Sequence, residues 1–140
     1  MIVLDTSGLL AAIDASQRHH PAAAAALRAS GQPRLLSPFV LAELDYLLGT
    51  RVSAEAENRF LAEVANGAYQ LEPFDRDDLD RARSILDRYA DLGLGLADAS
   101  IVVIAARAGT NRVLTLDERH FRAMRPLTGG RSFEVLPADA

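Results

Sequence analysis

The sequence predicts an α/β fold, with a short, mostly parallel central sheet of about five strands covered by helices on both faces. The chain alternates short apolar segments with longer segments of helical periodicity. Strands separated by helices of this length need crossover connections, which give parallel pairing and a sheet buried on both sides. A length of 140 residues suits one core, so we expect residues 1–140 to form a single domain.

Short apolar runs mark the expected strands, and the segments between them have the spacing of amphipathic or buried helices. The predicted strands are Ile2–Asp5, Arg34–Ser37, Tyr69–Glu72, Val113–Leu116 and Phe133–Leu136. The predicted helices span residues 7–14, 20–30, 38–50, 53–66, 76–91 and 97–108, with a short helical turn at 118–123.

Several predicted helices begin at residues that cap well. Ser37 precedes Pro38, which combines a capping hydroxyl with a proline suited to the first helical position. Ser53 can cap the following helix. Asp75 and Asp78 have the spacing at which two side chains cap each other's backbone amides. These signals support the predicted boundaries.

The composition is that of an ordinary globular protein, with 49% hydrophobic and 24% charged residues. The absence of cysteine excludes a disulfide framework, a thiolate zinc site and a catalytic cysteine. The N-terminus lacks a signal-peptide pattern, and no apolar run approaches the roughly 20 residues that span a bilayer, so we expect a cytoplasmic protein without membrane contact. The net charge of −4 counts against nucleic-acid binding through bulk electrostatics alone.

Four acidic residues occupy positions where an isolated charge is unexpected. Asp5 ends the first apolar run, Asp117 follows another, Asp98 opens a very apolar helix and Glu43 interrupts an apolar helical segment. In an open parallel sheet, the carboxyl ends of strands and the amino ends of helices share one edge. Carboxylates gathered there repel one another, and a hard divalent cation is the usual counterion. The pattern favours a Mg²⁺- or Mn²⁺-dependent enzyme acting on phosphate esters.

Glu43 is the least expected of the four on the basis of its neighbours. The residues three and four positions away are Phe39, Val40, Tyr46 and Leu47, all apolar or aromatic. The carboxylate is therefore expected to point toward the side of the helix that should be buried. The alternative is a glutamate at the edge of that stripe, with its carboxylate in water.

Each aspartate also has a structural alternative. Asp5 and Asp117 could be helix caps, and Asp98 could complement the dipole of its helix. His120 lies three residues after Asp117 and could join the rim of the site, although a surface histidine is the commoner case. The adjacent pair His19-His20 does not share a helix face, which argues against paired ligation.

Four motifs in order along the chain resemble the PIN-domain nucleases, in particular the VapC toxins of bacterial toxin–antitoxin pairs. The motifs are Leu4-Asp5-Thr6-Ser7, Pro38-Phe39-Val40-Leu41-Ala42-Glu43-Leu44, Leu96-Ala97-Asp98-Ala99 and Leu114-Thr115-Leu116-Asp117-Glu118-Arg119-His120-Phe121. The resemblance extends from Ile2 to about Leu136. It implies a three-layer α/β/α fold with an acidic metal site at the edge of the sheet.

The resemblance also implies the activity, a metal-dependent hydrolysis of RNA phosphodiesters that uses one or two Mg²⁺ or Mn²⁺ ions. We expect Asp5 and Asp98 to bind metal directly, with Glu43 and Asp117 holding metal or its waters. Thr6 and Thr115 are expected to hydrogen-bond these carboxylates. The arginines expected to contact RNA phosphates are Arg18, Arg51, Arg112, Arg119 and Arg122.

The partners implied by the resemblance are an RNA substrate, a second copy of the chain in a homodimer, and a small VapB-type antitoxin whose C-terminal segment covers the site. The target implied is a loop of ribosomal or transfer RNA. Apolar residues of the segment 38–66 are available for a partner or for the core. They are Tyr46, Leu47, Phe60, Leu61 and Val64.

Three other functions are weighed against this one. A phosphoacceptor receiver domain needs a lysine late in the chain, and the sequence has none. A haloacid-dehalogenase-type phosphatase needs Asp-x-Asp at the first strand, where this chain has Asp5-Thr6-Ser7. The remaining alternative is a non-catalytic PIN-like scaffold that binds RNA or protein, which would be indicated by loss of one of the acids.

Overall fold

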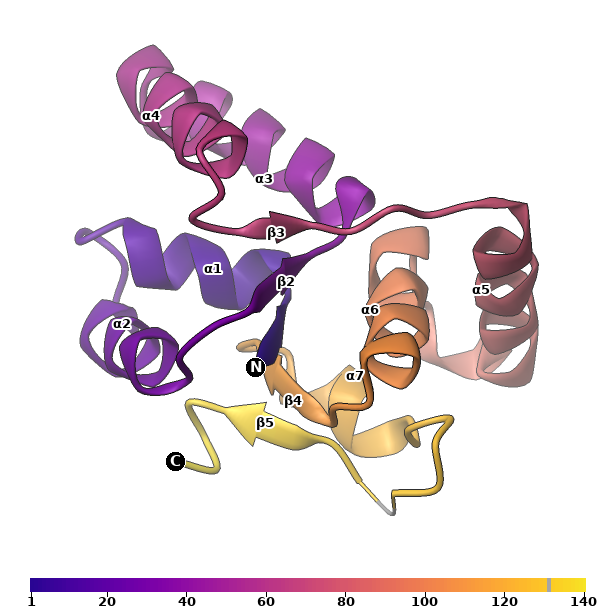
Figure 1. The fold of residues 1–140 in the computed structure, drawn as a ribbon. Helices are drawn as coiled ribbons and strands as arrows, with labels where there is room; N and C mark the ends of the chain where they lie inside the picture. Colours follow the sequence, from indigo (N-terminus) through magenta and orange to yellow (C-terminus); the bar gives the residue numbers. More distant parts are fainter. Residues whose placement is uncertain (131) are drawn as a thin grey trace.

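The computed structural model describes residues 1–130 and 132–140, which build a five-stranded sheet between two layers of helices (Figure 1). The strands are β1 (Ile2–Leu4), β2 (Arg34–Leu36), β3 (Gln70–Leu71), β4 (Arg112–Leu114) and β5 (Glu134–Leu136). Their order in the sheet is β3-β2-β1-β4-β5, and every pairing among the described residues is parallel. The predicted fold class is confirmed.

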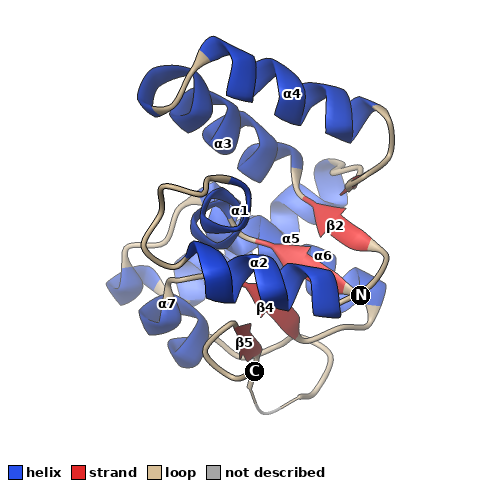
Figure 2. Ribbon diagram, turned by 90° about the vertical axis from the view of Figure 1, so that its left-hand side faces the viewer, coloured by secondary structure: helices blue, strands red, loops and turns tan. Residues whose placement is uncertain are grey.

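Helices α1 and α2 cover one face of the sheet, and α5 and α6 cover the other, while α3 and α4 form a hairpin that extends beyond β3 (Figures 1 and 2). The helices are α1 (Thr6–Ile13), α2 (His20–Ala29), α3 (Pro38–Arg51), α4 (Ala54–Ala65), α5 (Arg76–Arg88), the 3₁₀ helix η1 (Ala90–Leu92), α6 (Leu96–Ala108) and α7 (Glu118–Ala123). Within the described residues, no helix has the length and apolarity needed to cross a bilayer.

The capping residues lie where the sequence predicts them. Ser37 Oγ accepts a hydrogen bond from the backbone amide of Phe39 at 3.1 Å, and Ser53 caps α4 at 3.0 Å. At the start of α5, Asp75 and Asp78 accept each other's backbone amides at 3.0 and 3.1 Å. These bonds satisfy amides that have no partner inside their helices, which defines where each helix begins.

Two predicted boundaries are wrong by a few residues. The strand expected at Val113–Leu116 ends at Leu114, because the amide of Leu116 donates to the side chain of Ser7 instead of continuing the ladder. The helix expected at 76–91 ends at Arg88 and is followed by η1. The first difference arises from a contact between distant segments, and the second from a change to a 3₁₀ helix. Hydrophobic periodicity contains neither.

The middle of helix α6 is buried because this helix lies between the sheet and α5. Its residues Ala99–Ala105 are all buried. Helix α7 is anchored by Phe121, whose ring packs edge-to-face on Phe133 with centroids 5.8 Å apart. The core therefore fixes the start of α6 and the short helix α7, the two elements that begin next to Asp98 and Asp117.

Gly8 allows α1 to pass directly over the end of β4. A Cβ atom at this position would lie 2.7 Å from the amide nitrogen of Thr115 and closer still to the carbonyl of Leu114. We expect Gly8→Ala to destabilise the fold by about 1–3 kcal/mol or more in urea unfolding, because backbone atoms cannot yield as a side chain can. Gly130→Ala is the control, since its Cβ would meet Pro126 at an ordinary 3.6 Å. Equal stability of the two variants would contradict this close approach.

Candidate active site

Asp5 follows β1 directly and is nearly inaccessible to solvent, at 6% exposure. Its Oδ2 accepts hydrogen bonds from the hydroxyls of Thr115 at 2.6 Å and Ser7 at 3.1 Å. Burial is the main reason that its pKa rises from 3.8 to about 6, partly offset by the Thr115 bond and reinforced by the charge of Asp98. Although Asp5 precedes α1, its carboxylate forms no capping hydrogen bond in the described structure, and of that helix's backbone only Thr6, at its start, interacts with it. The capping alternative does not account for this residue.

Three side chains join the end of β1 to the loop after β4. The Thr115 hydroxyl donates to Asp5 and accepts from the backbone amide of Asp117 at 2.9 Å. The Ser7 hydroxyl, 3.3 Å from that of Thr115, accepts from the amide of Leu116 at 3.0 Å. Both hydroxyl protons are thus directed at Asp5, which fixes its orientation relative to Asp117.

The two threonines expected beside the acids differ in what they do. The Thr115 hydroxyl contacts Asp5, whereas Thr6 Oγ1 is buried with no hydrogen-bond partner in the described part of the chain. The expectation for the Thr6 hydroxyl is therefore wrong. Ser7 takes that place, because the first turn of α1 directs its side chain, and not that of Thr6, toward the loop after β4.

Asp98 and Asp117 lie at the starts of α6 and α7, and both cap. Asp98 Oδ2 accepts from the backbone amide of Gly95 at 3.0 Å, and Asp117 Oδ1 accepts from that of His120 at 3.2 Å. Capping and a role in an acidic site are not exclusive here, because the imidazole of His120 lies against both carboxylates. Its Nδ1 is 2.7 Å from Asp117 Oδ2 and 3.9 Å from Asp98 Oδ2.

The four predicted acids influence one another electrostatically. Burial raises the pKa of Asp98, and the charges of Asp117 and Glu43 raise it further, while the Gly95 amide and His120 lower it. Asp5 in turn is affected by Asp98. The topology has therefore gathered carboxylates from β1, α3, α6 and α7 at the carboxyl edge of the sheet, as the sequence predicts.

Of the two orientations considered for Glu43, the structure supports the alternative, a glutamate at the edge of the apolar stripe with its carboxylate in water. Its side chain is exposed, not directed at a buried stripe. The buried stripe of α3 consists of Val40, Leu44 and Leu48, four residues apart, whereas Tyr46 is 67% exposed. Because α3 extends beyond the sheet edge, only one narrow side of it meets the core, and Glu43 lies outside that side.

The arrangement fits a divalent cation. Ligand atoms of Asp98, Asp117 and His120 all lie within 4.8 Å of one another. Asp5 and Glu43 are not members of that compact group, although both are close enough to affect the site's charge. Carboxylate oxygens are the ligands that Mg²⁺ and Mn²⁺ prefer. Burial first, and repulsion by neighbouring acids in addition, raises the pKa of Asp5 and of Asp98, and a bound cation would offset both effects.

Two of the five arginines expected to contact RNA are already engaged. Arg122 forms a double hydrogen bond with Asp139 at 2.7 and 2.8 Å and a further one with Glu118 at 3.1 Å. Arg112 pairs with Glu134 at 3.2 Å and begins β4, so it lies at the sheet edge opposite the acids. These ion pairs make the two guanidinium groups less available to phosphate, and their contact with RNA stays a prediction. The other three, Arg18, Arg51 and Arg119, are exposed.

Similarity to known proteins shows the family of this chain. A family model described as the PIN domain matches residues 2–125. The chain belongs to the PIN-domain family. Its PIN domain is 44% identical to Ribonuclease VapC26 of Mycobacterium tuberculosis (strain ATCC 25618 / H37Rv) over 136 residues, 97% of this chain and all of the relative.

The fold gives the same result. A crystal structure of VapC20 from Mycobacterium tuberculosis, described as a Sarcin-Ricin loop cleaving toxin, superposes with a TM-score of 0.77. The match covers 86% of this chain and 92% of VapC20, at 25% identity. The predicted VapC-type PIN-domain ribonuclease is confirmed by these two likenesses.

Thr115 offers a test of how the PIN domain holds Asp5. We expect Thr115→Val to lower the free energy of unfolding by about 1–3 kcal/mol, because the buried Asp5 carboxylate loses a donor and the Asp117 amide loses its acceptor. Thr115→Ser keeps the hydroxyl and should be milder. Urea unfolding at pH 7 measures both, and a valine variant as stable as the serine variant would show that this hydroxyl is dispensable.

Proposed function

We propose that this VapC-type ribonuclease is a toxin that cuts a structured RNA loop with one or two Mg²⁺ or Mn²⁺ ions held at its acidic site. The observation that carries the proposal is the buried Asp5 carboxylate beside Asp98 and Asp117, at the carboxyl edge of a parallel sheet. Asp5, Asp98 and Asp117 would hold the cation. Glu43, exposed on α3, would hold its waters.

The residues of the site have distinct tasks in such a reaction. Asp5, Asp98 and Asp117 would hold a divalent cation, which would supply charge to polarise the phosphate and to make a water more acidic. Attack of that water on phosphorus would release the RNA 3′-oxygen and give a 5′-phosphate. Thr115 and Ser7 hold Asp5 in one orientation, and the Gly95 amide holds Asp98. Because these groups are already hydrogen-bonded, little rearrangement is needed when charge develops on the phosphate.

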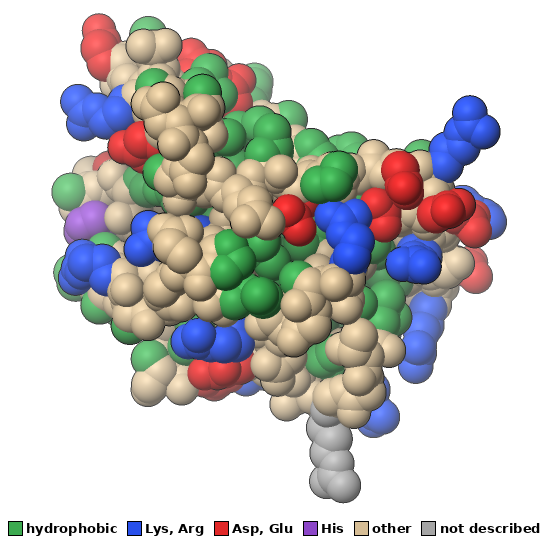
Figure 3. Space-filling view, in the orientation of Figure 1, with side chains coloured by type: hydrophobic (Ala, Val, Ile, Leu, Met, Phe, Trp, Pro, Cys, Tyr) green, Lys and Arg blue, Asp and Glu red, His purple; other side chains and the backbone are tan. Residues whose placement is uncertain are grey.

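We infer that the target is a loop of ribosomal RNA, by analogy with VapC20, which is described as cleaving the Sarcin-Ricin loop. Arg18, Arg51 and Arg119 would contact its phosphates. On the face shown in Figure 3, arginine and acidic side chains are interspersed over α5 and do not form one basic patch.

The test is end-mapping of total cellular RNA after incubation with purified protein and Mn²⁺ or Mg²⁺. Parallel reactions contain EDTA or the Asp98→Asn variant. Discrete cuts in ribosomal RNA that are absent from both controls would support the proposal. Cuts confined to transfer RNA would mean that the target is a transfer RNA and not a ribosomal loop. No metal-dependent cut in any RNA would contradict it.

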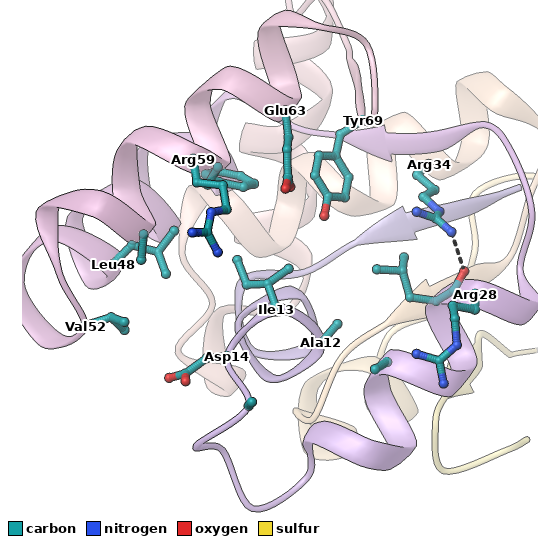
Figure 4. Close-up of a pocket in the computed structure, with 15 residues that line it drawn as sticks. Ala12, Ile13, Asp14, Arg28, Arg34, Leu48, Val52, Arg59, Glu63 and Tyr69 are labelled. Carbon is teal, nitrogen blue, oxygen red and sulfur yellow. Dashed lines mark hydrogen bonds between the residues drawn. The ribbon is translucent and has the colours of Figure 1, made fainter.

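We also propose a small antitoxin partner, supported by a cavity of about 480 Å³ between α1, α2, α3 and α4 (Figure 4). Its walls combine apolar side chains such as Leu48 with three arginines, Arg28, Arg34 and Arg59, and two acidic residues, Asp14 and Glu63, which leaves an excess of positive charge. This chemistry suits an apolar peptide segment that also carries acidic residues. Reversing the charge with Arg59→Glu should weaken the antitoxin complex in a titration while leaving RNA cleavage intact.

The apolar residues expected on segment 38–66 divide between core and surface. Phe60 is buried, Leu47 and Val64 are partly buried, and Tyr46 and Leu61 are exposed. We infer that the exposed pair contributes to a homodimer or to the antitoxin contact. Light scattering of the isolated protein distinguishes the two contacts, since a monomer would exclude the homodimer.

We also propose that residues 1–140 form one domain, because the buried side chains of the described residues form a common core.

A further inference from the structure

We propose that His120 is a direct ligand of the catalytic cation through Nδ1, so that the site contains a nitrogen donor and prefers Mn²⁺ or Co²⁺ to Mg²⁺. The inference rests on the proposed cation site and adds to it a residue outside the four acids. Three independent features of the ring carry it: its protonation pattern, the surroundings of Nδ1, and the way in which α7 holds it.

The hydrogen bond at Nε2 determines which nitrogen of the His120 ring carries the proton. Nε2 lies 3.0 Å from the backbone carbonyl oxygen of Leu92 in η1. A carbonyl oxygen can only accept, so Nε2 carries the proton and, in the neutral ring, Nδ1 has the free lone pair. A histidine that binds metal through one nitrogen commonly donates its other N–H to a backbone carbonyl in this way, which fixes both tautomer and ring orientation.

The near side of the ring places that lone pair among carboxylates. Nδ1 is buried and has no hydrogen-bond partner among the described residues, although Asp117 Oδ2 is only 2.7 Å away. That oxygen lies off the direction in which a ring N–H would point, so even a protonated ring would form a poor hydrogen bond with it. In the neutral ring, a lone pair so close to carboxylate oxygens is repulsive. Either a proton on Nδ1, whose charge lowers the pKa of Asp98, or a shared metal cation converts this repulsion into attraction.

The distances suit a cation after only a small adjustment. Two ligand atoms each about 2.1 Å from one ion are about 3 Å apart when adjacent and about 4.2 Å apart when opposite. Nδ1 is 2.7 Å from Asp117 Oδ2 and 3.9 Å from Asp98 Oδ2. After a small adjustment at Asp117, both separations fall within the range that two ligands of one cation span.

Helix α7 holds the ring in place. Asp117 and His120 are three residues apart and share a face of the helix, and Asp117 Oδ1 accepts the amide of His120. The next residue, Phe121, is fully buried against Phe133. The pair is thus positioned by the backbone and the core, which is the preorganisation that a ligand pair needs.

A nitrogen ligand changes which cation the site prefers. Imidazole suits the later first-row metals, whereas Mg²⁺ favours a shell made only of oxygen. A site made only of the four carboxylates would show a smaller preference for Mn²⁺ or Co²⁺ over Mg²⁺. The proposal therefore predicts a selectivity that loss of His120 alone should remove.

The test compares His120→Gln with the wild type and with His19→Gln. The glutamine amide can still reach the Leu92 carbonyl but places no nitrogen at Nδ1, so the ring's anchoring role is largely preserved. The control removes an exposed histidine outside the group formed by Asp98, Asp117 and His120. Binding of Mg²⁺, Mn²⁺ and Co²⁺ is measured by calorimetry, and pulsed electron paramagnetic resonance of the Mn²⁺-loaded protein reports directly bound nitrogen.

We expect His120→Gln to lose about tenfold or more in Co²⁺ affinity, with less than about threefold loss for Mg²⁺, and to lose a ¹⁴N coupling that wild type and His19→Gln both show. Wild-type protein that binds Mn²⁺ without ¹⁴N coupling would overturn the role of His120 and leave the acidic cation site standing. Wild-type protein that binds none of the three cations would overturn the cation site itself.

Discussion

Asp98→Asn is expected to abolish RNA cleavage and, at the same time, to raise the melting temperature of the metal-free protein. The loss of activity should be about a thousandfold or more, because a cation contributes several kcal/mol to the transition state and each 1.4 kcal/mol is a factor of ten. The gain in stability follows from the raised pKa of Asp98, which burial causes first and the charges of Asp117 and Glu43 increase. Removing a charge that the fold disfavours stabilises the folded state.

The substitution keeps the structural role of the residue. The asparagine carbonyl oxygen can still accept the amide of Gly95, which Asp98 Oδ2 accepts at 3.0 Å, so the start of α6 is preserved. Added Mn²⁺ should raise the melting temperature of the wild type by mass action and raise that of the variant less. Asp87→Asn, an exposed change on α5, is the control and should alter neither property. A lower melting temperature for Asp98→Asn would mean that the carboxylate is mainly a helix cap.

The acids could be located from the sequence because their positions depend on topology alone. Asp5 follows a strand and Asp98 begins a helix, and in a parallel sheet these ends must meet. No side-chain detail is needed for that inference. The same reasoning fails for Glu43, whose burial depends on how much of α3 meets the core. The hairpin of α3 and α4 extends past β3, and this is a property of packing that local periodicity does not contain.

The sequence did not reveal the contacts that Ser7 and His120 make with distant segments. Ser7 lies beside the predicted Thr6, and only the crossing of α1 over β4, which Gly8 permits, decides which of the two hydroxyls meets Thr115. His120 has one sequence signal, its spacing of three residues from Asp117 on a helix. Its second anchor, the Leu92 carbonyl, is 28 positions away and has no signature in the chain.

For the arginines, too, the sequence does not reveal which side chains are engaged by other residues. Arg122 is exposed and near the acids in sequence, which makes it resemble a phosphate contact. In the structure, Asp139, Glu118 and the C-terminal segment engage its guanidinium, and these bonds raise its pKa beyond the usual range. Position in the chain indicates proximity to the site, but only the partners of a side chain decide whether it is free to bind a ligand.

Asp5→Asn is expected to give the largest change in how stability depends on pH. Folding raises the pKa of Asp5 from 3.8 to about 6, chiefly through burial. The folded state therefore holds this proton more tightly than the unfolded state. The resulting stability is fully present below pH 3.8 and is lost as the pH rises through about 6. A difference of about two in pKa corresponds to about 3 kcal/mol, so the metal-free wild type should be less stable than the variant by up to that amount at pH 7.

Asparagine at this position retains an oxygen that can accept the hydroxyl protons of Thr115 and Ser7, so the comparison isolates the charge. Urea unfolding of both proteins in EDTA, at steps between pH 4 and pH 7.5, should give curves that nearly coincide at the acid end and diverge as the pH rises. Adding Mn²⁺ at pH 7 should close the gap by stabilising the wild type, because the cation replaces the proton as the partner of the buried carboxylate. A constant difference at every pH would mean that Asp5 is not desolvated in the folded protein, and the buried carboxylate could then no longer support the proposed cation site.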